Sequence, residues 1–321
     1  MKKIVTIGEI LVEFMAMERG NGFSQPISLV GPFPSGAPAI FIDQAARFGQ
    51  PCGMVGCVGA DDFGRLNLDR LKQDGVDTSG IAIDPDYATG SAFVRYRDDG
   101  SRDFVFNIRH SASGRTALTD AARALIDGSD HLHIMGTSLF SPQIVDLILE
   151  GIRLVKAKGG SVSFDPNVRA EMLGLPGLRR ALETVFSQCD LFLPSGQELY
   201  LFANANANAK TEAEAISQIL KGGVRAIVVK NGSMGATYHD CKTTVRQPAF
   251  KVEEFDPTGA GDCFGATFVS CWLRGMVPTD ALRYAAASGA RAVETQGPME
   301  GTSNFAELDA FIANTTNGSS S

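Results

Sequence analysis

Asp256-Pro257-Thr258-Gly259-Ala260-Gly261-Asp262-Cys263-Phe264-Gly265-Ala266 is the stretch of the sequence that says most about the fold. Gly259 and Gly261 let the backbone turn tightly and bring amide groups close to a ligand. An apolar-periodic helix begins at about the same point, so its first N–H groups and the positive end of its dipole face that ligand. The stretch therefore predicts a pocket for a phosphate group or a developing oxyanion.

Asp262 lies in the first turn of this helix and has two interpretations. Aspartate is a good N-cap residue, so its role could be purely structural. Alternatively, it is a general base that takes the proton from a hydroxyl attacking a phosphoryl group. The residues alone leave both interpretations open.

Other glycine-rich phosphate-binding motifs fit less well. The spacing of Gly259, Gly261 and Gly265 loosely imitates a dinucleotide fingerprint, but it lies near the C-terminus rather than in the first βα unit. The nearest imitation of a P-loop, residues 59–65, lacks the lysine and the hydroxyl residue. We therefore expect neither a dinucleotide-binding motif nor a P-loop.

The chain alternates short β-rich runs with amphipathic stretches. The expected strands are residues 4–7, 54–58, 131–135, 161–165, 191–193 and 226–230. The expected helices are residues 39–48, 65–72, 142–157, 211–220, 261–273 and 279–295. Such alternation predicts an α/β fold with a mostly parallel sheet and helices on both faces, and ligands at the carboxyl ends of the strands.

Two segments break this alternation. Residues 91–97 and 102–108 alternate polar and apolar side chains around Asp98-Asp99-Gly100-Ser101, which predicts a β-hairpin. With residues 11–30, this hairpin could form a small flap over the main sheet. The alternative is an edge hairpin with no function.

Composition and charge exclude several classes of protein. The 321 residues carry a net charge of −7 without a basic block, which argues against binding to nucleic acid. The six cysteines form no C-x-x-C pair, so we expect neither a zinc site nor disulfides. The N-terminus lacks a signal peptide and no apolar run is long enough to cross a membrane, so we expect a cytoplasmic protein. The polar tail, residues 313–321, is expected to be disordered.

The sequence resembles the ribokinase-like sugar kinases, also called the phosphofructokinase B family. Residues 256–264 are similar to the second signature of that family, and Pro34-Ser35-Gly36-Ala37-Pro38-Ala39 to the first. Residues 56–64 match the G-x-V-G-x-D-x-x-G segment that follows the first signature, and residues 230–236 the K-x-G-x-x-G-A turn. The resemblance extends from Gly8 to about Gly297.

The resemblance implies a fold and a reaction. We expect a three-layer sandwich with a mostly parallel central sheet, as one kinase domain over residues 1–312 with a lid formed by about 11–33 and 89–110. The implied reaction transfers the γ-phosphoryl group of ATP, with Mg²⁺, to a primary hydroxyl of a small sugar or sugar acid. A monovalent cation such as K⁺ is a further cofactor that the resemblance allows. Independently of the resemblance, the exposed face of the lid sheet could be the interface of a homodimer, because half-exposed sheets often pair.

The resemblance also implies roles for individual residues. Asp262 would be the catalytic base, and the amides of Gly259, Ala260 and Gly261 would hold the developing negative charge. The residues implied in substrate binding are Glu13, Gly36, Arg109, Asp165 and Arg169. Those implied on the nucleotide side are Lys230, Gly232, Gly235 and Ser288, and Glu198 is implied at the metal. Glu13, Arg109 and Arg169 could instead be ordinary solvated charges, and His131 and His133 are interpreted as structural.

Two positions depart from the family pattern. Ile40 stands where the first signature usually has a polar asparagine, and Ser195 replaces the asparagine of the metal-linked N-x-x-E motif. The acceptor stays open between a ketohexose of the tagatose or fructose type and 2-keto-3-deoxygluconate. A non-catalytic sensor of sugar or nucleotide on the same fold is the alternative function.

Overall fold

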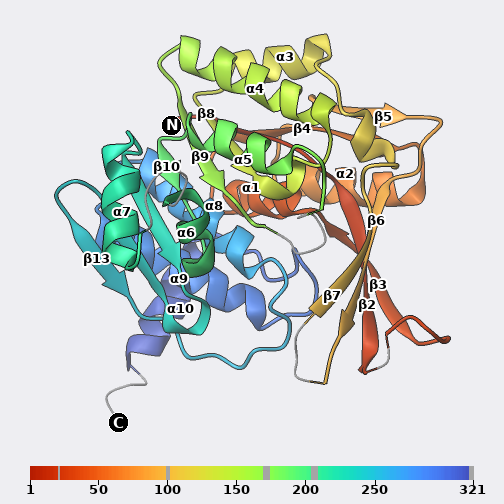
Figure 1. Cartoon of the computed structure of the whole chain (residues 1–321). Coiled ribbons are helices and arrows are strands. Elements are labelled where there is room, and N and C mark those ends of the chain that lie inside the picture. Colours follow the sequence, from red (N-terminus) through yellow and green to blue (C-terminus); the bar gives the residue numbers. More distant parts are fainter. Residues whose placement is uncertain (21, 99–101, 169–173, 204–208, 318–321) are drawn as a thin grey trace.

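A large, mostly parallel β-sheet runs through the computed structural model, which describes residues 1–20, 22–98, 102–168, 174–203 and 209–317 (Figure 1). The strands of this sheet are β1 (Ile4–Ile7), β4 (Cys52–Gly59), β5 (Ile81–Asp84), β8 (His131–Met135), β9 (Ser161–Asp165), β10 (Leu191–Phe192), β11 (Ala226–Lys230), β12 (Ala236–His239) and β13 (Thr244–Gln247). Their order is β13-β12-β11-β10-β9-β8-β1-β4-β5, and the antiparallel pairs among these described strands are β11–β12 and β12–β13. The carboxyl ends of the parallel strands therefore share one edge.

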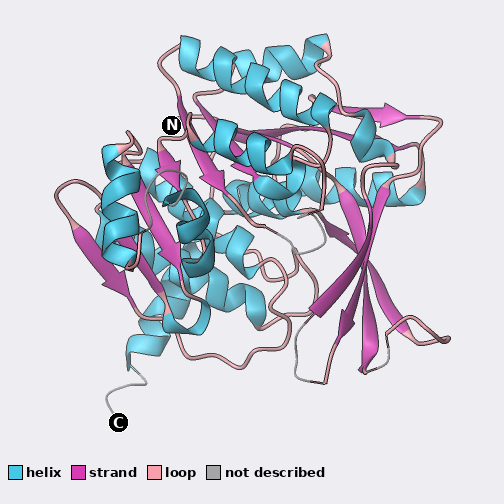
Figure 2. Ribbon diagram, in the orientation of Figure 1, coloured by secondary structure: helices cyan, strands magenta, loops and turns pink. Residues whose placement is uncertain are grey.

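Helices cover both faces of this sheet (Figure 2). One layer contains α1 (Ala37–Arg47), α2 (Asp62–Gln73), α8 (Ala260–Leu273), α9 (Pro278–Val293) and α10 (Phe305–Asn317). The other contains α3 (Asp120–Asp127), α4 (Pro142–Ala157), α5 (Leu178–Phe186), α6 (Gly196–Ala203) and α7 (Glu212–Lys221). The inner strands are apolar along most of their length because each of their faces packs against a helix layer.

Local sequence explains where several helices begin. The Ser141 hydroxyl accepts the Ile144 N–H at the start of α4, and Pro142 occupies the first turn, where its missing N–H costs nothing. Thr211 and Glu214 form a reciprocal capping box at the start of α7. These helices accordingly begin at, or within one residue of, the predicted positions.

A second, smaller sheet lies at one side of the molecule, where the flap was predicted (Figure 1). Its strands are β2 (Leu11–Arg19), β3 (Leu29–Ser35), β6 (Gly90–Tyr96) and β7 (Arg102–Asn107), in the order β3-β2-β6-β7. We call this sheet the lid. Because side chains alternate along β7, Arg102, Phe104 and Phe106 share the face opposite to that of Asp103 and Val105.

One expectation about the chain end was wrong. Residues 313–317, predicted to be part of a disordered tail, continue α10, and Thr315 donates a hydrogen bond to the Phe311 carbonyl one turn earlier. Aromatic packing explains the longer helix, because Phe311 contacts Phe250 at a centroid distance of 5.3 Å. Residues 318–321 lie outside the described part of the chain, as do Arg169 and residues 99–101, where a hairpin turn was predicted. Within the described residues, no helix is both long and apolar enough to cross a membrane.

Candidate active site

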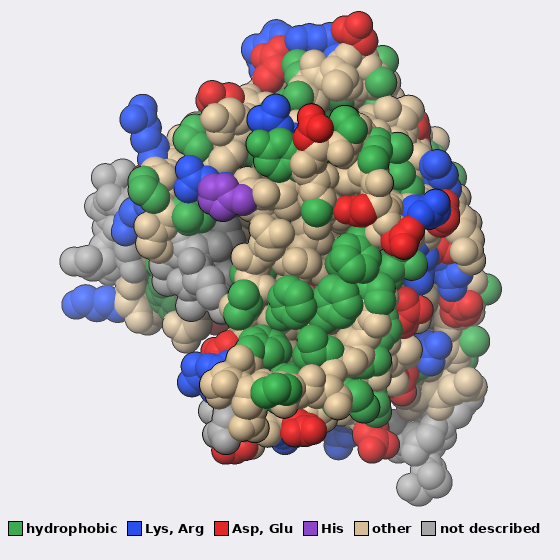
Figure 3. Space-filling model, turned by 90° about the vertical axis from the view of Figure 1, so that its right-hand side faces the viewer, with side chains coloured by type: hydrophobic (Ala, Val, Ile, Leu, Met, Phe, Trp, Pro, Cys, Tyr) green, Lys and Arg blue, Asp and Glu red, His purple; other side chains and the backbone are tan. Residues whose placement is uncertain are grey.

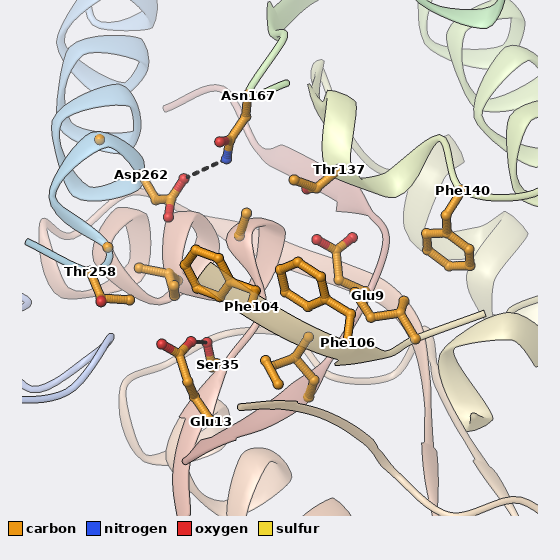
Figure 4. Close-up of a pocket in the computed structure, with 18 of the residues that line it drawn as sticks. Glu9, Glu13, Ser35, Phe104, Phe106, Thr137, Phe140, Asn167, Thr258 and Asp262 are labelled. Atoms are coloured by element: carbon orange, nitrogen blue, oxygen red, sulfur yellow. Dashed lines mark hydrogen bonds between the residues drawn. The ribbon is translucent and has the colours of Figure 1, made fainter. Parts of the chain in front are cut away.

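A cavity of about 410 Å³ lies between the lid and the carboxyl edge of the central sheet (Figure 4). It brings together residues that are far apart in the sequence. The predicted site residues that line it are Glu13, Gly36, Arg109, Lys230, Gly259, Gly261 and Asp262. Asp165 lies beneath it, at the end of β9, and is almost fully buried.

The N-terminus of α8 forms one wall of the cavity. Gly259 is its N-cap, with φ 79°, and a Cβ at this position would lie 2.4 Å from the Pro298 carbonyl oxygen. Only glycine fits such a close, left-handed turn. Nothing lies within 4 Å of a Cβ built on Gly261, so its backbone is open toward the cavity. This wall therefore offers helix-terminal amides and a positive dipole to an anion.

Asp262 points into the cavity from the first turn of α8 (Figure 4). Its carboxylate accepts a 3.4 Å hydrogen bond from the side-chain amide of Asn167, which follows β9. Asn167 has a φ of 38°, a region that few residues other than glycine and asparagine occupy. The backbone strain at Asn167 thus coincides with its contact to Asp262.

Asn167 was not among the predicted site residues, although it lies two residues after the end of β9. A signal for it was present, because polar residues directly after a parallel strand gather at the ligand-binding edge. Its positive φ and its contact with Asp262 depend on the tertiary structure.

Asp165 and Lys230 form an ion pair at the carboxyl ends of β9 and β11. Burial raises the pKa of Asp165, and the positive charge of Lys230 opposes this shift. The prediction assigned Asp165 to the substrate and Lys230 to the nucleotide. The structure places both charges in one pair, with Lys230 also lining the cavity.

Glu198 anchors two loops at the same edge of the sheet. Its carboxylate oxygens accept the Val168 N–H at 2.6 Å and the Ser195 N–H at 2.7 Å. The described residues contain no cluster of three or more His, Cys, Asp or Glu side chains that could hold a metal ion. The oxygen donors of Asp262 and Asn167 in the cavity nevertheless suit Mg²⁺, which keeps several of its waters and needs few protein ligands. The role of Glu198 at the metal stays a prediction.

The lid side of the cavity carries a second carboxylate. Glu13 on β2 is buried, and it accepts a 2.9 Å hydrogen bond from Ser35 on β3 (Figure 4). Gly36 follows with φ 112°, and a Cβ there would lie 2.5 Å from the Glu9 carbonyl oxygen. The glycine thus lets the chain pass closely from the lid into α1. Ile40, which replaces the usual asparagine, also lines the cavity.

Several residues of the cavity were not predicted. Glu9, two residues after the end of β1, accepts a 2.7 Å hydrogen bond from Ser138. Thr137 Oγ1 is buried with no hydrogen-bond partner among the described residues. Phe104 and Phe106 stack on each other at 5.1 Å in the middle of the cavity (Figure 4). The alternation of the hairpin placed these two rings on one face, but it did not show which face met the cavity.

The predicted nucleotide residues occupy different environments. Gly232 and Gly235 lie in the turn between β11 and β12, and the Gly235 carbonyl accepts the Asn231 N–H at 2.8 Å. Ser288 is fully buried in α9, where its hydroxyl donates to the Cys263 carbonyl at 3.2 Å and so ties α9 to α8. Their contacts with a nucleotide stay predictions.

Comparisons with known proteins agree with this geometry. The model of the pfkB family carbohydrate kinase matches residues 1–304. A putative ribokinase II from E. coli, solved in complex with ATP and Mg²⁺, is 47% identical with a TM-score of 0.91, covering 98% of this chain and 100% of that chain. A double mutant of fructokinase from Vibrio cholerae O395, bound to fructose, ADP and potassium, is 25% identical with a TM-score of 0.80, covering 97% and 98% of the two chains. A probable fructokinase-5 from Arabidopsis thaliana is 28% identical over 306 residues, 92% of this chain and 93% of that protein.

Proposed function

Since the chain belongs to the pfkB family of carbohydrate kinases, we propose that it transfers the γ-phosphoryl group of ATP to a primary hydroxyl of a ketohexose of the fructose or tagatose type. The observation that carries this proposal is the position of Asp262. Its carboxylate enters the cavity at the N-terminus of α8, opposite the buried Glu13 and Ser35 of the lid. A base, an anion site and a hydroxyl-binding carboxylate thus share one cavity.

Asp262 acts as the general base in this mechanism. Its oxygen takes the proton of the acceptor hydroxyl while that hydroxyl attacks the γ-phosphorus. The hydrogen bond from Asn167 holds the carboxylate in place. The amides of Gly259, Ala260 and Gly261 and the dipole of α8 stabilise the negative charge that develops on the transferring group.

ATP and Mg²⁺ are the cofactors, as they are in the E. coli relative. The oxygen donors of Asp262, Asn167 and Glu198 would hold Mg²⁺, which would neutralise charge on the phosphates. The turn containing Gly232 and Gly235, together with Lys230, lies on the nucleotide side of this proposal. K⁺, present in the Vibrio cholerae relative, is proposed as an additional cofactor.

Two observations support a ketohexose as acceptor. Fructokinases are prominent among the relatives of this chain, at 25–28% identity in the comparisons above. Glu13 and Glu9 are buried carboxylates beside hydroxyl side chains, and carboxylates accept strong hydrogen bonds from sugar hydroxyls.

A sugar acid such as 2-keto-3-deoxygluconate is the second candidate. Arg102 and Arg109 both line the cavity from the lid side, and guanidinium groups bind carboxylates in a bidentate manner. The two acceptors differ in charge, so Arg109→Met separates them. If the acceptor is an acid, this variant raises its KM strongly, whereas a neutral ketose is little affected.

The experiment that tests the function measures ADP release with Mg-ATP and a panel of fructose, tagatose, ribose, 2-keto-3-deoxygluconate and adenosine. Asp262→Asn, purified in parallel, is the control for contaminating kinases. Strong turnover on one acceptor by the wild type alone supports the proposal and selects the acceptor. Silence on all of them, with ligands that still raise the melting temperature, favours a non-catalytic sensor.

We also propose that two copies associate through the outer face of the lid. On that face Phe14 stacks on Phe93, and Val105 is 57% exposed. Figure 3 shows hydrophobic side chains gathered on this side of the molecule. A symmetric dimer would cover the patch with its own copy, because a two-fold interface is self-complementary.

Val105→Asp tests this dimer. A carboxylate in an apolar interface loses its hydration, so we expect the dissociation constant to rise about tenfold or more. Sedimentation velocity over a range of concentrations measures the shift. A wild-type protein that stays monomeric at high concentration would rule out the dimer.

A further inference from the structure

Arg102 connects the lid directly to the loop before α8. Its Nη1 donates a 2.8 Å hydrogen bond to Thr258 Oγ1, 156 positions further along the chain. Thr258 immediately precedes the Gly259–Gly261 turn, and both Arg102 and Thr258 line the cavity. The contact thus joins a strand of the lid to the amides proposed to hold the transferring phosphoryl group.

Hydrogen bonds to Asp256 fix the loop that contains Thr258, the residue that Arg102 contacts. The buried carboxylate of Asp256 accepts the Thr258 N–H with one oxygen and the Gly297 N–H with the other, both at 3.0 Å. Thr258 itself is only 8% exposed. Because the backbone around Thr258 is fixed by these hydrogen bonds, a contact to the Thr258 side chain also helps to fix the position of the adjacent turn at Gly259.

Two more lid residues lie near Asp256 and Gly297, which hold the Thr258 loop in place. Tyr96 pairs with Arg102 across β6 and β7; burial raises the pKa of Tyr96 to about 12, and the negative charge of Asp256 adds to this shift. Phe33 of β3 approaches Gly297 so closely that a Cβ there would lie 2.8 Å from its ring. The lid is thus seated on the segments around Asp256 and Gly297, with Arg102 as the charged contact.

We propose that Arg102 is a positioning residue that latches the lid onto Thr258 and so aligns the anion-binding turn for phosphoryl transfer. The hydrogen bond to Thr258 uses one of the five N–H donors of the guanidinium, and the positive charge lies beside the wall that receives the phosphoryl group. Latching excludes water, which otherwise competes with the sugar as acceptor. This inference rests on the proposed function, because it places the reaction at Asp262.

The test compares Arg102→Met with Arg97→Met. Arg97 is a matched control, since it lies on the same hairpin but pairs with Asp103 on the outer face, at 2.8 Å. We expect Arg102→Met to lower kcat by about 10- to 100-fold, the usual cost of a lost charged hydrogen bond. It should also raise the ratio of ATP hydrolysis to sugar phosphorylation, while Arg97→Met stays near the wild type on both measures.

A double-mutant cycle separates a latch from a general effect of charge. Thr258→Val removes the acceptor oxygen, and Thr258→Ser retains it. If the contact is the cause, Arg102→Met combined with Thr258→Val loses little more than either single change, and Thr258→Ser stays near the wild type. If the double variant instead loses kcat by the product of the two single losses, the two residues act independently and the proposed latch is wrong.

Amide hydrogen exchange tests the latch without catalysis. Arg102→Met should speed exchange in residues 102–107 of the lid, and Arg97→Met should not. If the enzyme phosphorylates none of the acceptors, the proposed function is contradicted. The exchange rates of the lid would still show whether Arg102 holds the lid on Thr258. Equal kinetics and equal exchange in Arg102→Met and Arg97→Met would overturn the inference.

Discussion

The central sheet and the lid sheet use their faces in opposite ways. The central sheet buries both faces under helices, and residues such as Phe164 and Phe192 are fully enclosed. The lid leaves one face to the cavity and turns the other outward, with Val105 exposed. The central sheet therefore contributes most of the buried core, while the lid lines the cavity with one face and leaves the other exposed.

Chemistry is divided between the two sheets as well. Asp262, Asn167 and Lys230 belong to the carboxyl edge of the central sheet and the helix beside it, while Glu13, Arg102 and Phe106 belong to the lid. We expect changes in the first region to act on kcat or on folding. Changes in the lid should act on acceptor binding and on the exclusion of water, and at Arg102, which contacts Thr258 beside α8, on kcat as well.

The largest expected effect comes from Asp262→Asn. This change keeps the shape of the side chain and removes the base, so kcat should fall by about 10²–10⁴-fold with little change in ATP affinity. Steady-state ADP release and nucleotide titration measure the two quantities. Unchanged turnover in a well-folded variant would refute the role of Asp262 as base.

Phe164→Ala should produce the largest loss of stability. Phe164 packs against Phe192 and Phe202 in the core, at centroid distances of 6.0 and 5.8 Å. Its removal leaves a cavity, and we expect the free energy of unfolding to fall by about 3–5 kcal/mol. Urea unfolding measures the loss. Val105→Ala on the outer face of the lid is the matched control, with a change of about 0.5 kcal/mol or less.

Phe106→Ala should affect binding of the sugar more than stability, unlike Phe164→Ala. The ring stacks on Phe104 within the cavity and is only partly buried, so its loss costs little stability. We expect the KM for the sugar to rise by about tenfold, the scale of one lost apolar contact surface. A large fall in stability with an unchanged KM would show that this part of the lid belongs to the core.

The smallest expected effect concerns pH and the two buried histidines of β8. Burial lowers the pKa of His131 to about 3, and that of His133 also lies well below its ordinary value. His131 hydrogen-bonds to Ser161 and Ser163 at 2.7 Å, and His133 stacks on Phe41 at 3.6 Å. Both histidines are thus neutral in the folded chain, in agreement with the structural role predicted for them.

Unfolding frees these histidines to bind protons below pH 6.5. Between pH 6.5 and about 3 the unfolded chain binds more protons at His131, so stability falls as the pH falls, by about 1.4 kcal/mol per pH unit at most. His131→Gln should make the decline between pH 7 and 5 shallower, even if it lowers stability at pH 7. Urea midpoints at several pH values measure the slopes, and identical slopes would contradict this account.

Regular elements were easier to predict than the site. The strands at residues 4–7, 131–135, 161–165 and 226–230 have the predicted bounds, because each is a short buried run that local pattern identifies. By contrast, α10 was not predicted, and its extension over residues 313–317 depends on packing of Phe311 against Phe250. Polar composition alone could not show that contact.

The site divides in the same way. The order of glycines and aspartates in residues 256–266 predicts an anion-binding helix terminus, because backbone freedom and helix dipoles act over a few neighbouring residues. By contrast, Asn167 reaches Asp262 and Arg102 reaches Thr258 from segments 95 and 156 positions away.

The sequence by itself thus determined the α/β architecture and the kinase family, since these depend on local pattern and on long, specific motifs. It also located the glycine-rich helix terminus that is proposed as the anion site. The tertiary structure decided which face of the lid meets the cavity, which carboxylates are buried beside hydroxyl groups, and how Lys230 is shared with Asp165. Such pairings are set by the packing of distant segments, and the free energy of a contact depends on burial and distance that no local pattern contains.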